Sequence, residues 1–309
     1  MTAGDLDLSA FPELPERRAI ALADKSAYDR ALAASPSPAS EMLFANAYLF
    51  RTAHETTIAR SHGCLVTIEH GYAGELYAMP PVGPGDRRAA FEAAFDAMAA
   101  EGAEPLLACA SESDLDALLP DRDRFDILED RDNFDYVYER AALAALRGNR
   151  YHRQKNLINR FSRRHAWESV PFGEDYINGA VALADAWCSF RCAFDRPSTF
   201  GETEALMEGA RRFREIGLSG RVVLVDGRVE AVALGEPGVA ECLAVCHFEK
   251  ANPEMTGLSQ VVCREFAAHV FPGAERLNRE QDLGDPGLRR AKGSYRPVDF
   301  VKKFRVRPR

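Results

Sequence analysis

The sequence predicts an α/β (α+β) protein made of two tandem domains, each built on a mixed β-sheet. Its 309 residues are 46% hydrophobic and 28% charged, and this length suits two domains of about 150 residues. Strand-like and helical patterns alternate along the chain. An Asp226-Gly227 dipeptide between two apolar runs predicts a β-hairpin, which anchors the order of elements in the second half.

The first half alternates helical segments with strand-like runs. The segments with apolar residues at helical spacing are 13–34, 41–50, 86–101 and 111–120. The strand-like runs, which end at glycine-containing or acidic turns, are 55–63, 64–71, 75–83, 105–111 and two within 125–140.

The second half has a more specific order. After a basic segment and two helices (173–194 and 202–217) come the hairpin 221–236, strand 242–250, helix 259–271, strand 275–280, helix 285–295 and strand 300–306. Hairpin, strand, glycine-containing loop, helix, strand, helix and strand is the order of the GNAT acyltransferase fold, and the first half repeats it loosely. We therefore expect two tandem GNAT-like domains, an N-terminal one at 1–145 and, with a basic connector helix, a C-terminal one at 146–309.

A block of positive charge stands out in this acidic chain. Between Arg140 and Arg164 there are eight Arg or Lys residues and no Asp or Glu, although the formal net charge is −8. The preceding stretch, 112–135, holds ten acidic residues against three arginines. Such a change of sign is typical of a surface that meets phosphate or another anion, the alternative being a solvated helix face paired with the acidic stretch.

The basic segment should form a helix or helix pair broken near Gly148. An amphipathic cationic helix can contact tRNA phosphates, an anionic membrane surface or the acidic first domain. The residues expected to hold a phosphate-bearing ligand are Arg150, His152, Arg153, Lys155, Asn156 and Arg160.

The cysteines and the N-terminus indicate a compartment. Seven cysteines without an export signal argue against a disulfide framework. Cys188 and Cys192 fall on a helical pattern, and Cys242 and Cys246 on a strand whose one face they would share, so we expect buried thiols and no metal site. No run reaches the roughly 18–20 apolar residues that span a bilayer. We expect a cytoplasmic protein without a transmembrane segment.

Several strings of the chain resemble one family. They are Tyr136–Arg140, Tyr151–Phe161, Glu249–Asn252, Leu277–Gly284 (with NREQDLG the most specific) and Gly287–Val298. On these pieces the protein resembles soluble members of the phosphatidylglycerol lysyltransferase C-terminal-domain family, most of which have no assigned function. The resemblance extends over most of the chain from about residue 45 onward.

This resemblance implies a tandem GNAT-like fold and a relation to enzymes that move an aminoacyl group from charged tRNA to an acceptor. In the lipid-modifying relatives the acceptor is a phospholipid, and a multi-helix membrane module precedes the domain. We expect no such module here. The implied chemistry is therefore acyl or aminoacyl transfer, with the acceptor open.

The loop before the helix at 259–271 is the expected donor site. In GNAT enzymes that use acetyl-CoA, a Q/R-x-x-G-x-G/A loop holds the pyrophosphate with backbone N–H groups. Here KANPEMTGLSQ retains only Gly257 and the helix start at Ser259. It is either a reduced phosphate site or a plain loop capped by Thr256 or Ser259. Acyl-CoA is disfavoured, but it stays open as a donor beside aminoacyl-tRNA, and no cofactor is assigned.

The string NREQD follows a predicted strand, and ligands of open α/β sheets bind outside the carboxyl ends of strands. If strand alternation continues, Asn278, Glu280 and Asp282 share one face while Arg279 and Gln281 share the other. Two carboxylates and an amide could grip an ammonium group or act as a general base. The alternative is an ion-paired, turn-capping cluster.

The next helix places Lys292 and Tyr295 three residues apart, on a face that looks back at the strand end. Tyr295 lies where GNAT-like enzymes often have the tyrosine that protonates the leaving group. A packed ring with its hydroxyl at the surface is the alternative.

The sequence thus predicts a GNAT-like transferase that moves an aminoacyl or other acyl group onto an amine or hydroxyl. Glu280 or Asp282 would bind or deprotonate the acceptor, and Tyr295 would act as the acid. The residues expected to bind the donor or substrate, beside those of the basic helix, are Gly257, Ser259, Asn278, Arg279 and Lys292. The alternative is a non-catalytic GNAT-fold protein that binds an anionic ligand or nucleic acid.

Overall fold

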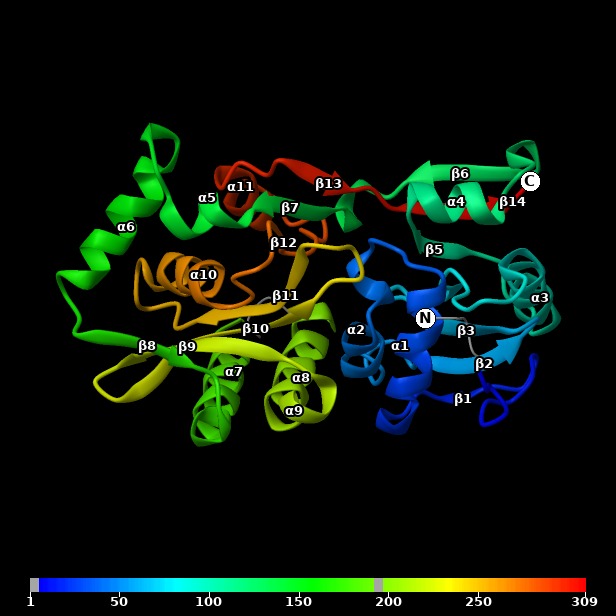
Figure 1. Cartoon of the computed structure of the whole chain (residues 1–309), viewed down its shortest axis with the longest axis horizontal. Coiled ribbons are helices and arrows are strands. Elements are labelled where there is room, and N and C mark those ends of the chain that lie inside the picture. The colour runs from blue at the N-terminus through cyan, green and yellow to red at the C-terminus, as the bar shows by residue number, and fades with distance from the viewer. Residues whose placement is uncertain (1–5, 192–196) are drawn as a thin grey trace. The chain divides into compact units, whose positions relative to one another are not determined.

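The computed structural model describes residues 6–191 and 197–309. They form two compact units, the first made of residues 1–135 with 301–309 and the second of residues 136–300. Within the described residues each unit contains a seven-stranded mixed sheet with helices packed on it (Figure 1). The predicted class, α/β with two tandem GNAT-like units on mixed sheets, is confirmed.

The first unit has the strand order β1-β2-β3-β4-β5-β14-β6, in which only β4 and β5 are parallel neighbours. Its strands are β1 (Arg18–Ala19), β2 (Thr57–Ser61), β3 (Cys64–His70), β4 (Leu76–Ala78), β5 (Leu107–Ala110), β6 (Phe125–Glu129) and β14 (Phe304–Pro308). Its helices are α1 (Lys25–Ala34), α2 (Phe44–Leu49), α3 (Arg87–Ala100) and α4 (Glu112–Leu118).

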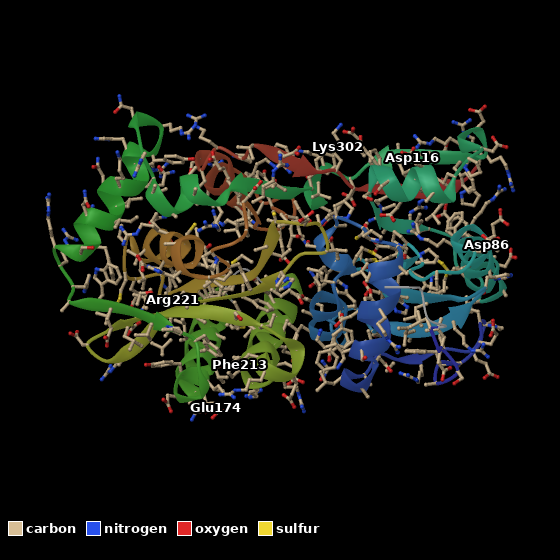
Figure 2. All side chains as sticks on the ribbon, in the orientation of Figure 1. Asp86, Asp116, Glu174, Phe213, Arg221 and Lys302 are labelled. Carbon is tan, nitrogen blue, oxygen red and sulfur yellow. The ribbon has the colours of Figure 1, made fainter. Side chains whose placement is uncertain are left out.

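Helix α3 forms where its sequence predicts. The Asp86 side chain, labelled in Figure 2, accepts a hydrogen bond from the Ala89 amide at 3.0 Å and caps the first turn. Phe91, Phe95 and Met98 lie at helical spacing and are buried, so one face of the helix covers the sheet.

The second unit has the order β13-β7-β12-β11-β10-β9-β8, in which β11 and β12 are the parallel pair. Its strands are β7 (Asp135–Glu139), β8 (Trp167–Pro171), β9 (Ser219–Val225), β10 (Arg228–Pro237), β11 (Leu243–Ala251), β12 (Arg276–Asn278) and β13 (Asp299–Val301). Its helices are α5 (Arg140–Ala145), α6 (His152–Ser162), α7 (Ile177–Arg191), α8 (Pro197–Arg211), α9 (Phe213–Ile216), α10 (Leu258–His269) and α11 (Pro286–Ser294).

Two local features stabilise the second unit, and the first of them was predicted. Asp226 and Gly227, both at positive φ (50° and 75°), make the tight turn between β9 and β10. At the other side of the unit, Phe213 of α9 packs edge to face on Phe172, with ring centroids 5.1 Å apart (Figure 2).

The two strand orders coincide when β1 is matched to β8 and each later strand to its counterpart. The sixth position of each sheet is then filled from the other half of the chain: β14 lies between β5 and β6, and β7 between β12 and β13. The chain therefore passes from one unit to the other at 135/136 and again at 300/301. These limits differ from the expected division at 145/146 because β7 pairs with β12, α5 packs on α10 and β14 pairs with β5 and β6.

Three expectations about elements are corrected. The helical pattern over 13–34 becomes a helix only from Lys25, because Pro12 and Pro15 favour extended backbone before them and Arg18–Ala19 joins the sheet. The expected strand 300–306 is two strands in different sheets, separated at Lys302–Lys303. Strand β8, which pairs antiparallel with β9, was not expected at all.

Lys303 lies at the second passage of the chain and is fully buried. Its Nζ donates to Asp135 Oδ1 and Glu41 Oε1, both at 2.6 Å. Asp135, also fully buried, accepts from the Ser40 amide and hydroxyl at 3.0 Å. Burial raises the pKa of Glu41 to about 7, with Asp135 adding to the effect and Lys303 opposing it. Lys303 is thus a buried cation that bonds two carboxylates inside the core.

No helix among the residues that the structure describes is both long and apolar enough to cross a bilayer.

We expect Lys303→Met to destabilise the fold, because it leaves the Asp135 carboxylate buried without a cation. Removing one partner of a buried pair costs roughly 3–5 kcal/mol. Urea unfolding followed by circular dichroism measures the loss. The matched control is Lys302→Met, whose side chain is 45% exposed and whose ion pairs are at the surface, and it should change stability by less than about 1 kcal/mol. Equal losses in the two variants would show that the buried pair is not a major constraint.

Candidate functional site

The parallel strands β11 and β12 separate early. They pair over three residues only, Leu243–Val245 with Arg276–Asn278, and β12 then ends while β11 continues to Ala251. Past Val245 the edge of β11 faces the turn that follows β12 instead of a strand. We call this place the strand gap; it lies at the carboxyl ends of a parallel pair, where ligands of open α/β sheets bind.

His247 enters the gap through a β-bulge. Leu234 of β10 pairs with Phe248, and the next residue, Gly235, pairs with Cys246, so His247 is an extra residue on β11. Its ring is 1% exposed, and both ring nitrogens have carboxylate partners.

We call Glu236, His247 and Glu280 the Glu–His–Glu cluster. His247 Nδ1 is 2.7 Å from Glu280 Oε1, and Nε2 is 3.0 Å from Glu236 Oε1. Burial alone would lower the pKa of His247, but the hydrogen bonds and charges of the two carboxylates raise it to about 10. An imidazolium that donates to both carboxylates gives the cluster a formal charge of −1. Such a cluster can hold an ammonium group or fix one carboxylate as a base.

Glu280 reaches His247 because its backbone is left-handed, with φ at 54°. Its amide donates to Asn278 Oδ1 at 2.7 Å, and its carbonyl accepts from the Tyr136 amide at 3.1 Å. A non-glycine residue in this region costs on the order of 1–3 kcal/mol, so the surrounding bonds must hold it there. The expectation that Asn278, Glu280 and Asp282 continue one strand face is wrong, since the strand ends at Asn278.

Asp282 is fully buried and has several donors. It accepts from the Tyr136 hydroxyl at 2.6 Å, from Arg289 Nε and Nη2 at 2.9 and 2.7 Å, and from the Gly284 amide at 3.0 Å. Burial raises the pKa of Asp282, but these hydrogen bonds outweigh it and hold the pKa below its usual range. This is the arrangement of the ion-paired, turn-capping alternative. Of the two carboxylates expected in the site, Glu280 bonds a residue of β11, whereas Asp282 bonds Tyr136 and Arg289.

Arg279, next to Glu280, also reaches across the strand gap. Its Nη2 donates to both carboxylate oxygens of Glu249 on β11, at 2.9 and 3.0 Å. Its guanidinium carbon lies 5.4 Å from the Tyr138 ring centroid and 4.8 Å from that of Tyr295. Lys292 Nζ donates to the Arg279 carbonyl, so the following helix fixes the same turn.

Tyr295 is in the core of the unit rather than at the surface. Its ring is 5% exposed, and burial raises the pKa of its hydroxyl well above the usual range. It packs with Cys263 of α10 and the Arg279 guanidinium. The packed-ring alternative therefore accounts for its position, although its hydroxyl is bonded to Cys263 and does not reach the surface as that alternative expected.

Helix α6 presents a cationic surface. Gln154, Ile158 and Phe161 are buried beneath it. We call the following Arg and Lys residues of the segment the cationic face: Arg147, Arg150, Arg153, Lys155, Arg160, Arg163 and Arg164. All are exposed except the half-buried Lys155, and none forms an ion pair with a carboxylate in the described part of the second unit. His152 and Asn156 on the same helix pair with each other at 3.2 Å.

The eighth cation of the basic block has a structural use. Arg140 donates to the carbonyl oxygens of Ala267, Pro272 and Ala274 at 2.6 to 2.9 Å, at and beyond the carboxyl end of α10. A cation at this end of a helix satisfies carbonyls that have no partner within the helix.

Gly257 is the N-cap residue of α10, with φ at 102°. Close packing against α6 explains why a glycine stands at this position. A Cβ there would stand 2.4 Å from the Leu157 carbonyl oxygen of α6. No side chain caps this helix, so the expected cap at Thr256 or Ser259 is wrong. Ser259 is exposed beside this contact.

Helix α6 also touches the helix that carries Lys292. Gln154 Nε2 donates to the Ser294 carbonyl at 3.0 Å, close to the end of α11. The predicted residues therefore form two groups in one unit, the α6 surface with Gly257 and the strand gap with Glu280. Helix α11 connects them.

The expected donor loop is tightly packed at its glycine. The loop has one glycine, and Leu157 fills the space beside it. Two side-chain pairs, Arg279 with Glu249 and Glu280 with His247, bridge the strand gap.

The cysteines form no metal site in the residues described, where no group of His, Cys, Asp and Glu could hold an ion. Cys188 and Cys246 are buried, whereas Cys242 is exposed just before β11, so the expected shared face of Cys242 and Cys246 is wrong. Cys192 lies outside the described residues.

Sequence reasoning missed His247 and Glu236. Both had a signal, because each is a titratable residue that directly follows an apolar stretch of a predicted strand. The bulge that turns His247 toward Glu280 depends on pairing between β10 and β11, which no local pattern reveals.

We expect the stabilising effect of His247 to weaken at high pH. Its pKa rises from 6.5 to about 10 on folding, so its contribution is complete below pH 6.5 and is lost as the pH rises toward 10. The difference in unfolding free energy between the wild type and His247→Gln should be largest near pH 6. Urea unfolding at pH 6, 8 and 10 measures it. The exposed-site control, His152→Gln, should give a small difference, and a pH-independent gap for His247 would contradict the proposed charge state.

We expect Asp282→Asn to destabilise the protein by roughly 2–4 kcal/mol, because Arg289 and Tyr136 lose a buried anionic acceptor. Asp285→Asn, which keeps an amide oxygen as acceptor at the exposed start of α11, is the control and should cost less than about 1 kcal/mol. Thermal unfolding compares the two. Equal stability of Asp282→Asn and the wild type would argue against a structural role for Asp282.

Known proteins agree with the fold and with the predicted resemblance. The family model described as phosphatidylglycerol lysyltransferase, C-terminal, matches residues 33–307. A conserved protein of unknown function from Bacteroides thetaiotaomicron is 30% identical, with a TM-score of 0.83, and the match covers 95% of this chain and 99% of that one. None of the curated proteins matches the sequence significantly.

Two more distant structures share the fold. The C-terminal domain of a putative lysylphosphatidylglycerol synthetase from Agrobacterium fabrum has a TM-score of 0.59 at 11% identity, covering 91% of this chain and 92% of that one. L-PGS from Bacillus licheniformis has a TM-score of 0.60 at 13% identity, covering 84% and 86%. With a family model that spans nearly the whole chain, the protein belongs to the phosphatidylglycerol lysyltransferase C-terminal family.

Proposed function

We propose that the protein transfers an aminoacyl group from aminoacyl-tRNA to an amine or hydroxyl acceptor. Its family and fold are of the acyltransferase or aminoacyltransferase kind. The single observation that supports the proposal most is the Glu–His–Glu cluster at the strand gap. There, Glu280 is held in a strained backbone conformation and bonded to a buried histidine.

In the proposed reaction the acceptor nitrogen or oxygen attacks the ester carbonyl carbon of the donor, and its proton passes to the Glu280 carboxylate. The proton then passes to the departing ribose oxygen as the carbon–oxygen bond breaks. Acylated acceptor and free tRNA leave, and Glu280 is ionised again. His247 and Glu236 position the carboxylate, and a general base placed in this way contributes about 10²–10⁴-fold.

The cationic face of α6 is the proposed tRNA surface. Its side chains are not neutralised by carboxylates of the second unit, in the part described, and so can meet phosphates directly. Because α6 packs on α10 through Gly257 and on α11 through Ser294, it is held in a fixed place relative to the strand gap. Phosphate contacts of this kind weaken with salt.

A second candidate is a non-catalytic protein that binds an anionic ligand or nucleic acid. One observation favours it: Gly257, the one glycine of the expected donor loop, packs against the Leu157 carbonyl of α6. Both candidates use the cationic face to bind an anion, and only the first predicts that an aminoacyl group is transferred.

Transfer is tested with tRNA charged with a mixture of radiolabelled amino acids, offered with phosphatidylglycerol vesicles and with a pool of soluble amines. We expect label to move to one acceptor class, and Glu280→Gln to reduce the rate about 100-fold with donor binding unchanged. Glu275→Gln, an exposed carboxylate just before β12, is the control and should keep full activity. Binding without transfer in the wild type would favour the second candidate.

The donor surface is tested by binding of the same charged tRNA at several salt concentrations. Arg153→Glu with Arg160→Glu should weaken binding and make the salt dependence shallower. Arg228→Glu, an exposed arginine on β10, should not. Unchanged tRNA affinity, or binding of anionic vesicles alone, would rule out tRNA as the ligand of this surface.

A further inference from the structure

Arg279 is held from several sides at the strand gap. The rings of Tyr138 and Tyr295 lie 5.4 and 4.8 Å from its guanidinium carbon, and Nη2 is bonded to both oxygens of Glu249. Lys292 binds its backbone carbonyl. The side chain is 10% exposed. A guanidinium restrained in this way has little freedom left to lose when a ligand binds.

Its Nη1 is the exception within this network. That nitrogen is buried and has no hydrogen-bond acceptor among the residues described. Leaving a buried donor without a partner costs on the order of 1–3 kcal/mol, and more when the group is charged. Because Arg279 cannot lose its proton, the cost is not avoided by neutralisation. An acceptor oxygen supplied by a ligand would remove it.

The orphan nitrogen belongs to the same gap as Glu280. Arg279 and Glu280 are consecutive, and their partners on β11, Glu249 and His247, are two residues apart. Arg279, which has a donor nitrogen without an acceptor, and the Glu280 carboxylate therefore both reach across the strand gap to β11. Acyl transfer needs this combination, since the attacking group gives up a proton while the carbonyl oxygen gains negative charge.

We propose that Arg279 Nη1 donates to the carbonyl oxygen of the donor's acyl group and stabilises the oxyanion that forms on attack. This inference rests on the proposed transfer reaction. When the acceptor atom bonds to the carbonyl carbon, the π electrons move to the oxygen that faces Nη1. They return to re-form the carbonyl as the bond to the ribose oxygen breaks, and Glu280 passes the acceptor's proton to that oxygen. The step needs no further reactant.

Two adenosine analogues separate oxyanion binding from turnover. One carries an aminoacyl group through a 3′-amide and has a planar, neutral carbonyl; the other has a tetrahedral, anionic phosphonate at the same place. Calorimetry should show that the wild type binds the phosphonate more than about tenfold tighter, as transition-state analogues do. Arg279→Met should bind the amide as before and lose most of this preference. In the transfer assay, kcat should fall about 100-fold with KM little changed.

Variants keep the test independent of folding. Arg279→Met with Glu249→Gln removes both charges of the pair, so no unpaired carboxylate remains if the single variant is unstable. Arg276→Met, whose exposed side chain pairs with exposed Asp299, is the matched control on the same strand and should retain the preference.

The outcomes distinguish this inference from the proposed function. Retention of the phosphonate preference in Arg279→Met overturns the role of Nη1. Equal binding of the two analogues by the wild type also overturns it, while an aminoacyl donor still stands. Failure of the wild type to bind either analogue overturns the donor class and this inference with it.

Discussion

The buried ion pair between Lys303 and Asp135 fixes the point at which the chain passes between its two sheets. Asp135 is the first residue of β7, and Lys303 directly precedes β14. Because β7 continues into Tyr136 and Tyr138, the ion pair sets the start of the strand that holds the NREQD turn. Tyr136 binds Asp282, and the Tyr138 ring lies beside Arg279. One short segment, 135–138, therefore carries both the partner of Lys303 and two tyrosines of the candidate site.

The candidate site consists of departures from regular strands. A bulge turns His247 out of the alternation of β11, and the left-handed Glu280 ends that of β12. Each departure costs stability, and each directs a titratable side chain into the strand gap. Departures from local rules that are held in place by surrounding bonds tend to occur at functional sites. The hydrogen bonds of Asp282 to Tyr136, Arg289 and Gly284 supply this restraint. Glu280 and Arg279 instead extend into the strand gap.

The fold could be predicted from sequence wherever short-range chemistry decides it. The Asp226-Gly227 turn and the Asp86 cap are set by a few neighbouring residues. In the site, the polar turn after a strand was predicted, but the end of the strand at Asn278 and the different roles of Glu280 and Asp282 were not. These roles depend on Tyr136 and His247, which are distant in sequence. The placement of β14 in the first sheet and β7 in the second was missed for the same reason, because local periodicity does not reveal which strands pair.

The exchanged strands also constrain how the protein folds. Residues 304–308 pair with strands that begin about 180 to 200 positions earlier, so the first sheet is closed by a very long loop. Contacts of such sequence separation form slowly, and during synthesis the first sheet keeps an unpaired slot beside β5 until this segment has been made. Neither half of the chain contains all seven strands of its own sheet in the described residues.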